Sequence, residues 1–143
     1  MARVIYLTPD FAVAGQLAPA DFAALAAQGF KSIVSNRPDG EEYSQLSADQ
    51  SRELATAAGL QFRHLPLRMP DVLDPATANA TRDVLDAMPG PILAFCKSGT
   101  RSAIAWAAAA SLVAPVETVI DALNKSEFVI PGLAGELRAR AAR

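Results

Sequence analysis

The stretch from Pro91 to Ser111 constrains the fold more than any other part of the chain. It begins with the apolar run ILAF at residues 92–95, which follows Pro-Gly-Pro and predicts a short buried strand. It ends in a run of alanines around Trp106, which predicts a helix facing the core. The sequence CKSGTRS joins the two at residues 96–102. We therefore expect a strand, a loop of small residues and a helix in direct succession.

The loop between this strand and helix has the character of an anion-binding site. A small-residue loop that opens a helix turns backbone N–H groups inward, with the positive end of the helix dipole behind them. Cys96, the only cysteine, begins the loop, and Lys97 and Arg101 add positive charge that favours its thiolate. The planar guanidinium of Arg101 suits an oxyanion or a sulfur-bearing ligand. A lone cysteine is more often a small buried hydrophobe, but an arginine closing the loop favours a catalytic nucleophile.

Length and composition favour one domain over residues 1–143. Of the 143 residues, 51% are hydrophobic, which is enough for a core without disulfides or a structural metal. A single cysteine cannot form an internal disulfide and favours a reducing compartment. The N-terminus lacks the apolar region of a signal peptide, and no apolar run reaches the length of a membrane span. We expect a cytoplasmic protein without a membrane span.

The same composition argues against several kinds of partner. A formal net charge of −2 gives no basis for binding nucleic acid. One histidine and the absence of CxxC or HxxxH spacing make a metal site unexpected, and no cofactor is implied. The remaining partner class is a small molecule, either a sulfane-sulfur donor or a phosphorylated substrate. The sequence does not indicate an oligomeric state.

Strand and helix patterns alternate along the chain. Strands are expected at residues 4–8, 11–14, 31–35, 60–67 and 92–95, the first two being either two short strands or a strand and a turn. Helices are expected at residues 18–28, 47–58, 74–88, 102–113, 116–125 and 133–142. Short connections between such elements predict an α/β fold with a small, mostly parallel central sheet flanked by helices.

Two loops outside the cysteine loop hold candidate pocket residues. Asn36 and Arg37 follow a predicted strand, and in open α/β sheets ligands bind beyond the carboxyl ends of the strands. Pro-Asp-Gly is also ordinary turn chemistry, so a solvated turn is the alternative, and we expect Asp39 and Glu41 to be solvated. His64, the only histidine, is a further candidate. A half-buried strand residue or a hydrogen-bonded support is a more common role for it than a catalytic base.

Asp71 is the candidate proton donor. The nearby Asp74 precedes Pro75 and is expected to be the N-cap of a helix, whereas Asp71 has no evident structural role. A carboxylic acid over a cysteine–anion site would protonate a leaving group. The alternative is a carboxylate in a surface turn.

Nearly the whole chain resembles a known family. The strings GFKSI at 29–33, NRPDGE at 36–41, HLPL at 64–67 and CKSGTRS at 96–102 are similar to the phosphatase-like domain of beta-lactamase-hydrolase-like proteins and their stand-alone bacterial relatives. The resemblance implies the three-layer fold of dual-specificity tyrosine phosphatases. It also implies that Cys96 is the nucleophile, that Arg101 binds the anion and that the Ser102 hydroxyl steadies the thiolate. The anion-binding loop would consist of Lys97, Ser98, Gly99 and Thr100.

The loop length departs from the phosphatase pattern. Tyrosine phosphatases have five residues between the cysteine and the arginine, whereas this chain has four, as many rhodanese-type sulfurtransferases do. Phe95 stands where phosphatases usually have histidine. A shorter ring of N–H groups suits one sulfane sulfur on Cys96 better than a tetrahedral phosphate. Our leading hypothesis is a sulfurtransferase that works through a Cys96 persulfide. The alternatives are a phosphatase that forms a phosphocysteine, with Asp71 as the acid, and a non-catalytic anion-binding module.

Overall fold

A five-stranded sheet forms the centre of the computed structural model, which describes residues 1–143. The strands are β1 (Ile5–Thr8), β2 (Phe11–Ala14), β3 (Ser32–Ser35), β4 (Gln61–His64) and β5 (Ile92–Phe95), in the spatial order β1-β2-β5-β3-β4. Only β1 is antiparallel to its neighbour, and the other pairs are parallel. The predicted small, mostly parallel sheet is confirmed.

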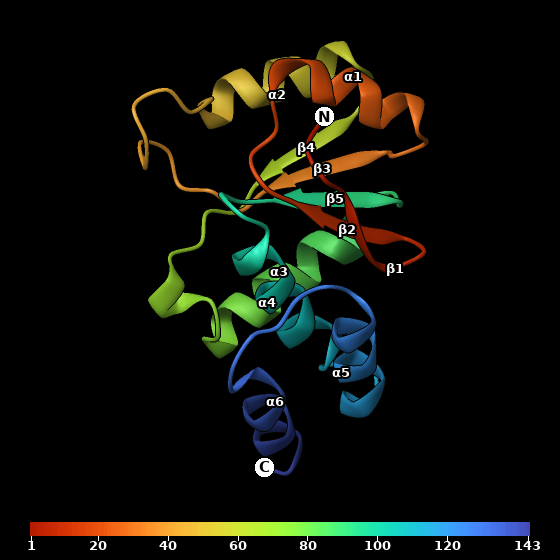
Figure 1. The fold of residues 1–143 in the computed structure, drawn as a ribbon, viewed down its shortest axis with the longest axis vertical. Coiled ribbons are helices and arrows are strands. Elements are labelled where there is room, and N and C mark those ends of the chain that lie inside the picture. The colour runs from red at the N-terminus through yellow and green to blue at the C-terminus, as the bar shows by residue number, and fades with distance from the viewer.

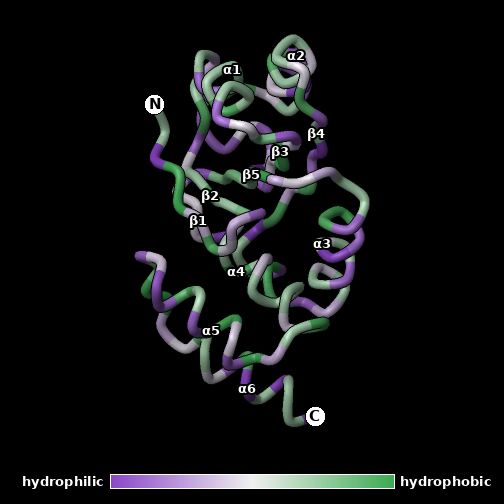
Figure 2. Tube along the Cα trace, turned by 90° about the vertical axis from the view of Figure 1, so that its right-hand side faces the viewer, coloured by the Kyte–Doolittle hydropathy of each residue, from purple (hydrophilic) through white to green (hydrophobic).

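Helices cover both faces of this sheet. They are α1 (Pro19–Ala27), α2 (Ala48–Ala57), α3 (Pro75–Ala87), α4 (Thr100–Ala110), α5 (Val116–Lys125) and α6 (Leu133–Ala141), with a short 3₁₀ turn, η1, at Met69–Asp71. Figure 1 shows α1 and α2 on one side of the strands and α3 to α6 on the other, and Figure 2 shows the same separation after a quarter turn. The result is the predicted three-layer architecture. No helix is both long and apolar enough to cross a bilayer.

Strand β5 lies in the middle of the sheet and contributes to both halves of the core. Successive side chains of a strand point to opposite faces. Leu93 and Phe95 pack in the cluster beneath α1 and α2, and Ile92 and Ala94 pack in the cluster on the side of α3 to α6. All four are buried. A strand buried on both faces needs an unbroken apolar run, which explains the sequence of β5.

Three predicted element ends differ from the structure by two residues or more. Strand β4 ends at His64 rather than at residue 67. The Leu65 N–H still donates to Ser35 O, but the Leu67 N–H donates to Asn36 O, one residue short of the parallel register, so the regular pairing with β3 ends here. Helix α4 begins at Thr100, two residues earlier than expected, and ends at Ala110, three residues earlier than expected. Gly99 precedes it as N-cap with a φ of 93°, so the cysteine loop is shorter than the sequence suggested.

The predicted caps of α2 and α3 have different outcomes. The capping box of α2 is confirmed, because the Gln50 N–H donates to Ser47 Oγ at 3.1 Å and the Ser47 N–H donates to Gln50 Oε1 at 2.9 Å. Asp74 occupies the N-cap position of α3, but its side chain makes no capping hydrogen bond. Asp74 therefore stands at the predicted N-cap position but does not cap the helix with its side chain. Pro75 begins the helix as predicted.

The first prediction tests the contribution of the central strand to stability. Leu93 is fully buried in β5, so Leu93→Ala should lower the free energy of unfolding by about 2–5 kcal/mol through lost burial and a residual cavity. Leu112→Ala is the control, because Leu112 is 53% exposed and its truncation should change stability by less than about 0.5 kcal/mol. Urea denaturation followed by circular dichroism measures both. Equal losses in the two variants would contradict the assignment of β5 to the core.

Candidate active site

The sheet places Cys96 directly after its central strand. Strand β5 pairs along its length with β2 on one side and β3 on the other. The Cys96 N–H continues the ladder by donating to Ala14 O at 3.4 Å. Its side chain is fully buried. The sheet therefore holds the thiol at the carboxyl ends of the parallel strands, where ligands bind in open α/β folds.

Gly99 shapes the loop around the sulfur. Its N–H donates to Cys96 Sγ at 3.1 Å. Its φ of 93° lies in the left-handed region, which favours glycine. A Cβ at this position would also lie 3.2 Å from Cζ of Phe128. Both the backbone conformation and the nearby phenyl ring therefore favour a glycine at the point where the loop reaches the sulfur.

The cysteine loop contains N–H groups that are not used by the protein itself. The backbone N–H groups of Lys97, Ser98, Thr100, Arg101 and Ser102 donate no hydrogen bond to a backbone carbonyl. The last three form the first turn of α4, where the helix dipole is positive. The side chains of Ser98 and Thr100 hydrogen-bond to each other at 3.1 Å. The loop thus has the donors that the predicted anion-binding role requires.

Arg101 is paired with an acidic residue from another loop. Its Nη1 and Nη2 donate to the two carboxylate oxygens of Glu41, each at 2.8 Å, and Nη1 also donates to Leu67 O at 2.9 Å. Glu41 Oε1 accepts a third bond from Arg37 Nε at 3.0 Å. Glu41 is exposed, as expected, but its carboxylate also pairs with Arg101 and Arg37, which the sequence did not predict. The Glu41 carboxylate accepts from the two Arg101 nitrogens that we expected to bind an anionic ligand.

Charge pairing at this site changes two pKa values. The hydrogen bonds from Arg101, aided by those from Arg37 and by both positive charges, lower the pKa of Glu41 to about 2. The same pairing raises the pKa of Arg101, and the nearby Cys96 adds to that rise. Glu41 is therefore ionised at neutral pH and has no proton to donate.

Arg37 is the buried centre of a second set of contacts. The side chain is 3% exposed, and besides Glu41 it donates to Gln16 Oε1 and to Glu42 Oε1, both at 2.9 Å. Lys97 Nζ lies 3.2 Å from the same oxygen of Glu42. The hydrogen bond with Lys97, followed by that with Arg37, lowers the pKa of Glu42. The Arg37 side chain is buried in these contacts rather than in a solvated turn, and its role in lining a ligand site stays a prediction.

Three other predicted residues form supports behind the loop. Ser102 Oγ donates to Asn36 Oδ1 at 2.8 Å, and Asn36 Nδ2 donates to Leu65 O at 2.9 Å. The Ser102 hydroxyl hydrogen is thus engaged by Asn36, and the donor that reaches Cys96 Sγ is the Gly99 N–H instead. The half-buried His64 lies 2.9 Å from Arg37 O through Nε2, in keeping with the hydrogen-bonded support that the sequence favoured over a catalytic base.

Asp71 lies away from these contacts. It is exposed in η1, and its side chain makes no hydrogen bond or ion pair, although its backbone carbonyl accepts from Thr77 Oγ1 at 2.8 Å. It borders a separate pocket with His64 and Leu67 rather than the cysteine loop. The structure does not bring its carboxylate into contact with Cys96 or Arg101.

Glu41, Glu42 and Gln16 are site residues that the sequence analysis missed. The two glutamates are consecutive acids in the loop after β3, which faces the basic loop after β5. Opposite charges after two neighbouring strands could have predicted that these loops form ion pairs with each other. Gln16 had no comparable signal, because its place depends on a turn after β2 in which its N–H donates to Lys97 O.

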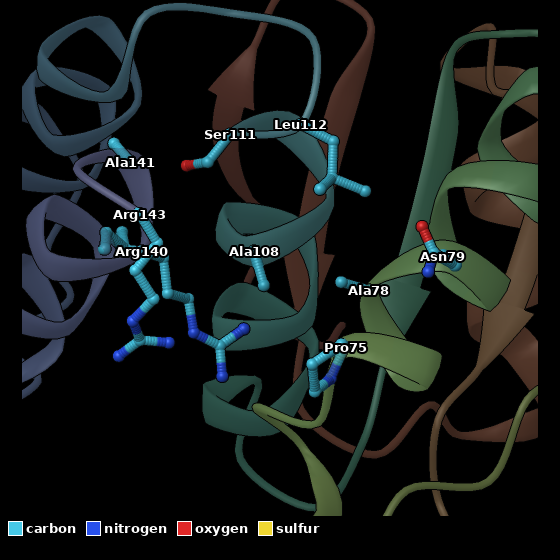
Figure 3. A pocket seen from close by; sticks show the side chains of 10 residues that line it. Pro75, Ala78, Asn79, Ala108, Ser111, Leu112, Arg140, Ala141 and Arg143 are labelled. Carbon is cyan, nitrogen blue, oxygen red and sulfur yellow. The ribbon is translucent and has the colours of Figure 1, made fainter.

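A different hollow lies between α3, α4 and α6. Figure 3 shows Ala78, Ala108 and Leu112 along its wall, with Arg140 and Arg143 at one side. Ala108 is eight residues beyond Thr100 on α4, about 12 Å along the helix axis. Arg140 already donates to Glu136 and to the carbonyl of Leu73. This hollow is separate from the cysteine loop. No three His, Cys, Asp or Glu side chains lie together in a way that would hold a metal ion.

The likeness to known proteins agrees with this geometry. Residues 3–113 match the family described as beta-lactamase hydrolase-like protein, phosphatase-like domain. The chain belongs to this family. A beta-lactamase hydrolase-like protein of Agrobacterium fabrum is 38% identical over 100 residues, which are 70% of this chain and 23% of the relative. The chain therefore spans about a quarter of the length of this curated relative.

Solved structures show the same fold. A presumed phosphatase from Neisseria meningitidis is 28% identical, with a TM-score of 0.81 over 94% of this chain and 96% of that one. Kinase-associated phosphatase is 14% identical, with a TM-score of 0.69 over 99% of this chain and 96% of that one. The fold is that of the tyrosine-phosphatase-like proteins, as the resemblance implied.

The second prediction concerns the acid stability that Glu41 provides. Its pKa of about 2 in the folded protein lies below the ordinary value of 4.5, so its pairing stabilises the fold above pH 4.5. That contribution is lost as the pH falls toward 2. Glu41→Gln should cost about 1 kcal/mol at pH 7, allowing for solvent screening, and the difference from the parent should vanish near pH 2.

Urea denaturation at a series of pH values between 7 and 2 measures this difference. Glu53→Gln is the matched control, because Glu53 is an exposed glutamate of α2 that forms no ion pair. A constant gap between Glu41→Gln and the parent at all pH values would contradict the assignment.

Proposed function

We propose that this domain is a sulfurtransferase in which Cys96 carries sulfane sulfur as a persulfide. The observation that supports it most is the state of the carboxylates at the site. Glu41 and Glu42 pair with Arg101, Arg37 and Lys97, and these contacts lower both carboxyl pKa values. Both acids beside the cysteine loop are therefore held as carboxylates in ion pairs, and neither is placed as a proton donor. A phosphomonoester leaving group gains most from a proton donor, whereas a sulfite or thiolate leaving group needs none.

The proposed reaction has two balanced steps. The Cys96 thiolate attacks the outer sulfur of thiosulfate, the sulfur–sulfur bond of thiosulfate breaks, and its electron pair leaves with sulfite. Cys96 now holds the transferred atom as a persulfide anion. An acceptor such as cyanide or a small thiolate attacks that atom and restores the Cys96 thiolate. Total charge is conserved in both steps, and neither requires a proton or an external oxidant.

The residues around Cys96 have distinct parts in this scheme. The Gly99 N–H bonds to the sulfur, and the unpaired N–H groups of the first turn of α4 supply further donors for the added negative charge. Arg101 pairs with Glu41 in the structure, so an anionic donor would compete with that carboxylate for the guanidinium. The loop length of four residues supports the same chemistry, since a shorter ring suits one bound sulfur atom.

A phosphatase is the second candidate, and the comparisons favour it. The family is described as phosphatase-like, and the Neisseria meningitidis neighbour is a presumed phosphatase. In that scheme Cys96 forms a phosphocysteine and Asp71 protonates the leaving oxygen. Asp71 would have to move toward the cysteine loop, because its side chain has no contact there. Membership of this family supports an enzyme with a cysteine nucleophile in either case.

The third prediction is a paired turnover assay that separates the two activities. Thiosulfate with cyanide should give thiocyanate, and p-nitrophenyl phosphate should release little p-nitrophenol. Cys96→Ser should reduce thiocyanate formation to the uncatalysed rate, because the hydroxyl is a far weaker nucleophile than the thiolate. Dominant phosphate release that depends on Cys96 would establish the phosphatase. Absence of both activities in a folded protein would favour a non-catalytic anion-binding module.

The fourth prediction uses Asp71. Asp71→Asn should leave thiosulfate–cyanide turnover within about twofold of the parent, because that reaction has no protonated leaving group. In a phosphatase the same change should lower kcat by about 10²–10⁴, the usual contribution of a general acid. Asp83→Asn, an exposed aspartate of α3, is the control. A large loss of thiosulfate–cyanide turnover in Asp71→Asn, with Asp83→Asn unaffected, would overturn the proposed mechanism.

A further inference from the structure

A polar pocket borders the segments that contact Arg101 and Arg37, although no residue of the cysteine loop lines it. It has a volume of about 490 Å³, and its lining includes Pro38, Asp39, His64, Leu67, Arg68 and Asp71. These residues come from the loop after β3, from the end of β4 and from η1. We call this hollow the β4 pocket. Its size lies within the range of small-molecule sites.

The β4 pocket shares its walls with the catalytic contacts. Leu67 lines the pocket, and its carbonyl accepts the hydrogen bond from Arg101 Nη1. His64 lines it as well and contacts Arg37 O. Asp39 is two residues before Glu41 in the same loop. A molecule in this pocket would therefore lie against the segments that hold Arg101 and Arg37.

The charges in the β4 pocket are unpaired. Arg68 contacts no carboxylate and no aromatic ring, which among the arginines of this chain is true otherwise only of Arg63. Asp71 has no side-chain partner, and Asp39 uses one oxygen to accept the Ala48 N–H at 2.8 Å. One arginine and two aspartates, none of them in an ion pair, therefore line the same pocket. This arrangement disfavours a dianion and suits a ligand with both a carboxylate and an ammonium group.

We infer that the β4 pocket binds the amino-acid portion of a low-molecular-mass thiol persulfide, with Arg68 on its carboxylate and Asp71 on its ammonium group. This inference rests on the proposed sulfurtransferase function and names its substrate class. The Cys96 thiolate attacks the terminal sulfur of the persulfide, the sulfur–sulfur bond of the donor breaks, and the donor leaves as its thiolate. Oxidation states balance, because a sulfane sulfur passes from one thiolate to another. The pocket holds the carrier, and the cysteine loop receives its sulfur atom.

The binding test uses a probe that cannot react. S-methylglutathione keeps the zwitterionic amino-acid end but has a thioether in place of the persulfide, and calorimetry measures its dissociation constant. Arg68→Gln should weaken binding about tenfold, the loss expected for one hydrogen bond to a charged group. Arg63→Gln is the matched control, because Arg63 is an exposed arginine on β4 outside the pocket, and it should bind as the parent does. Equal affinities in the two variants would overturn the inference.

A second comparison tests the ammonium site. The S-methylglutathione analogue without its α-amino group should bind the parent protein more weakly, and Asp71→Asn should remove most of this difference. In turnover, Arg68→Gln should raise KM for glutathione persulfide and leave KM for thiosulfate unchanged.

The failures of the two proposals are distinguishable. Thiosulfate turnover without binding of the thioether would refute the pocket and leave the sulfurtransferase. Binding of the thioether without any sulfur transfer that depends on Cys96 would refute the sulfurtransferase, and with it the persulfide as the ligand of the pocket.

Discussion

The double pairing of strand β5 fixes the position of the reactive thiol. Hydrogen bonds to β2 and β3 hold this strand in the middle of the sheet, and its four apolar side chains anchor both halves of the core. Cys96 follows β5 immediately, so the sheet also holds the backbone of Cys96 in place. Helix α4 then begins within four residues and packs against α3. The loop between has little freedom, and Gly99 is needed for its sharp turn back to the sulfur.

The second constraint is electrostatic and connects two strand ends. Glu41 and Glu42 from the loop after β3 pair with Arg101 and Lys97 from the loop after β5. The buried Arg37 bonds to both glutamates, and a charge with so little access to water must be paired. These contacts give the site its charge balance, because each cation near the sulfur has a carboxylate partner. An incoming anion therefore meets a preformed ion-pair network and competes with it.

Most of the fold could be predicted from local patterns. The strand–loop–helix unit around Cys96, the capping box at Ser47 and the proline start of α3 each depend on a few neighbouring residues. The errors were at the end of β4, where the register with β3 changes after Leu65, and at both ends of α4, which Gly99 with a φ of 93° precedes as N-cap. Predictions from apolar periodicity do not register such single-residue effects on hydrogen bonding and φ.

The sequence by itself determined the nucleophile, the arginine and the loop length, because all three lie within residues 96–101 and their relation is covalent. Only the tertiary structure decided which carboxylates reach them. Glu41 contacts Arg101 across 60 positions of the chain, and Ser102 bonds to Asn36 across 66. Asp71 is closer to Cys96 in sequence than Glu41 is, yet its side chain has no contact at the site. Such pairings depend on which strand ends the sheet brings together, and the order of strands is a property of the packed fold.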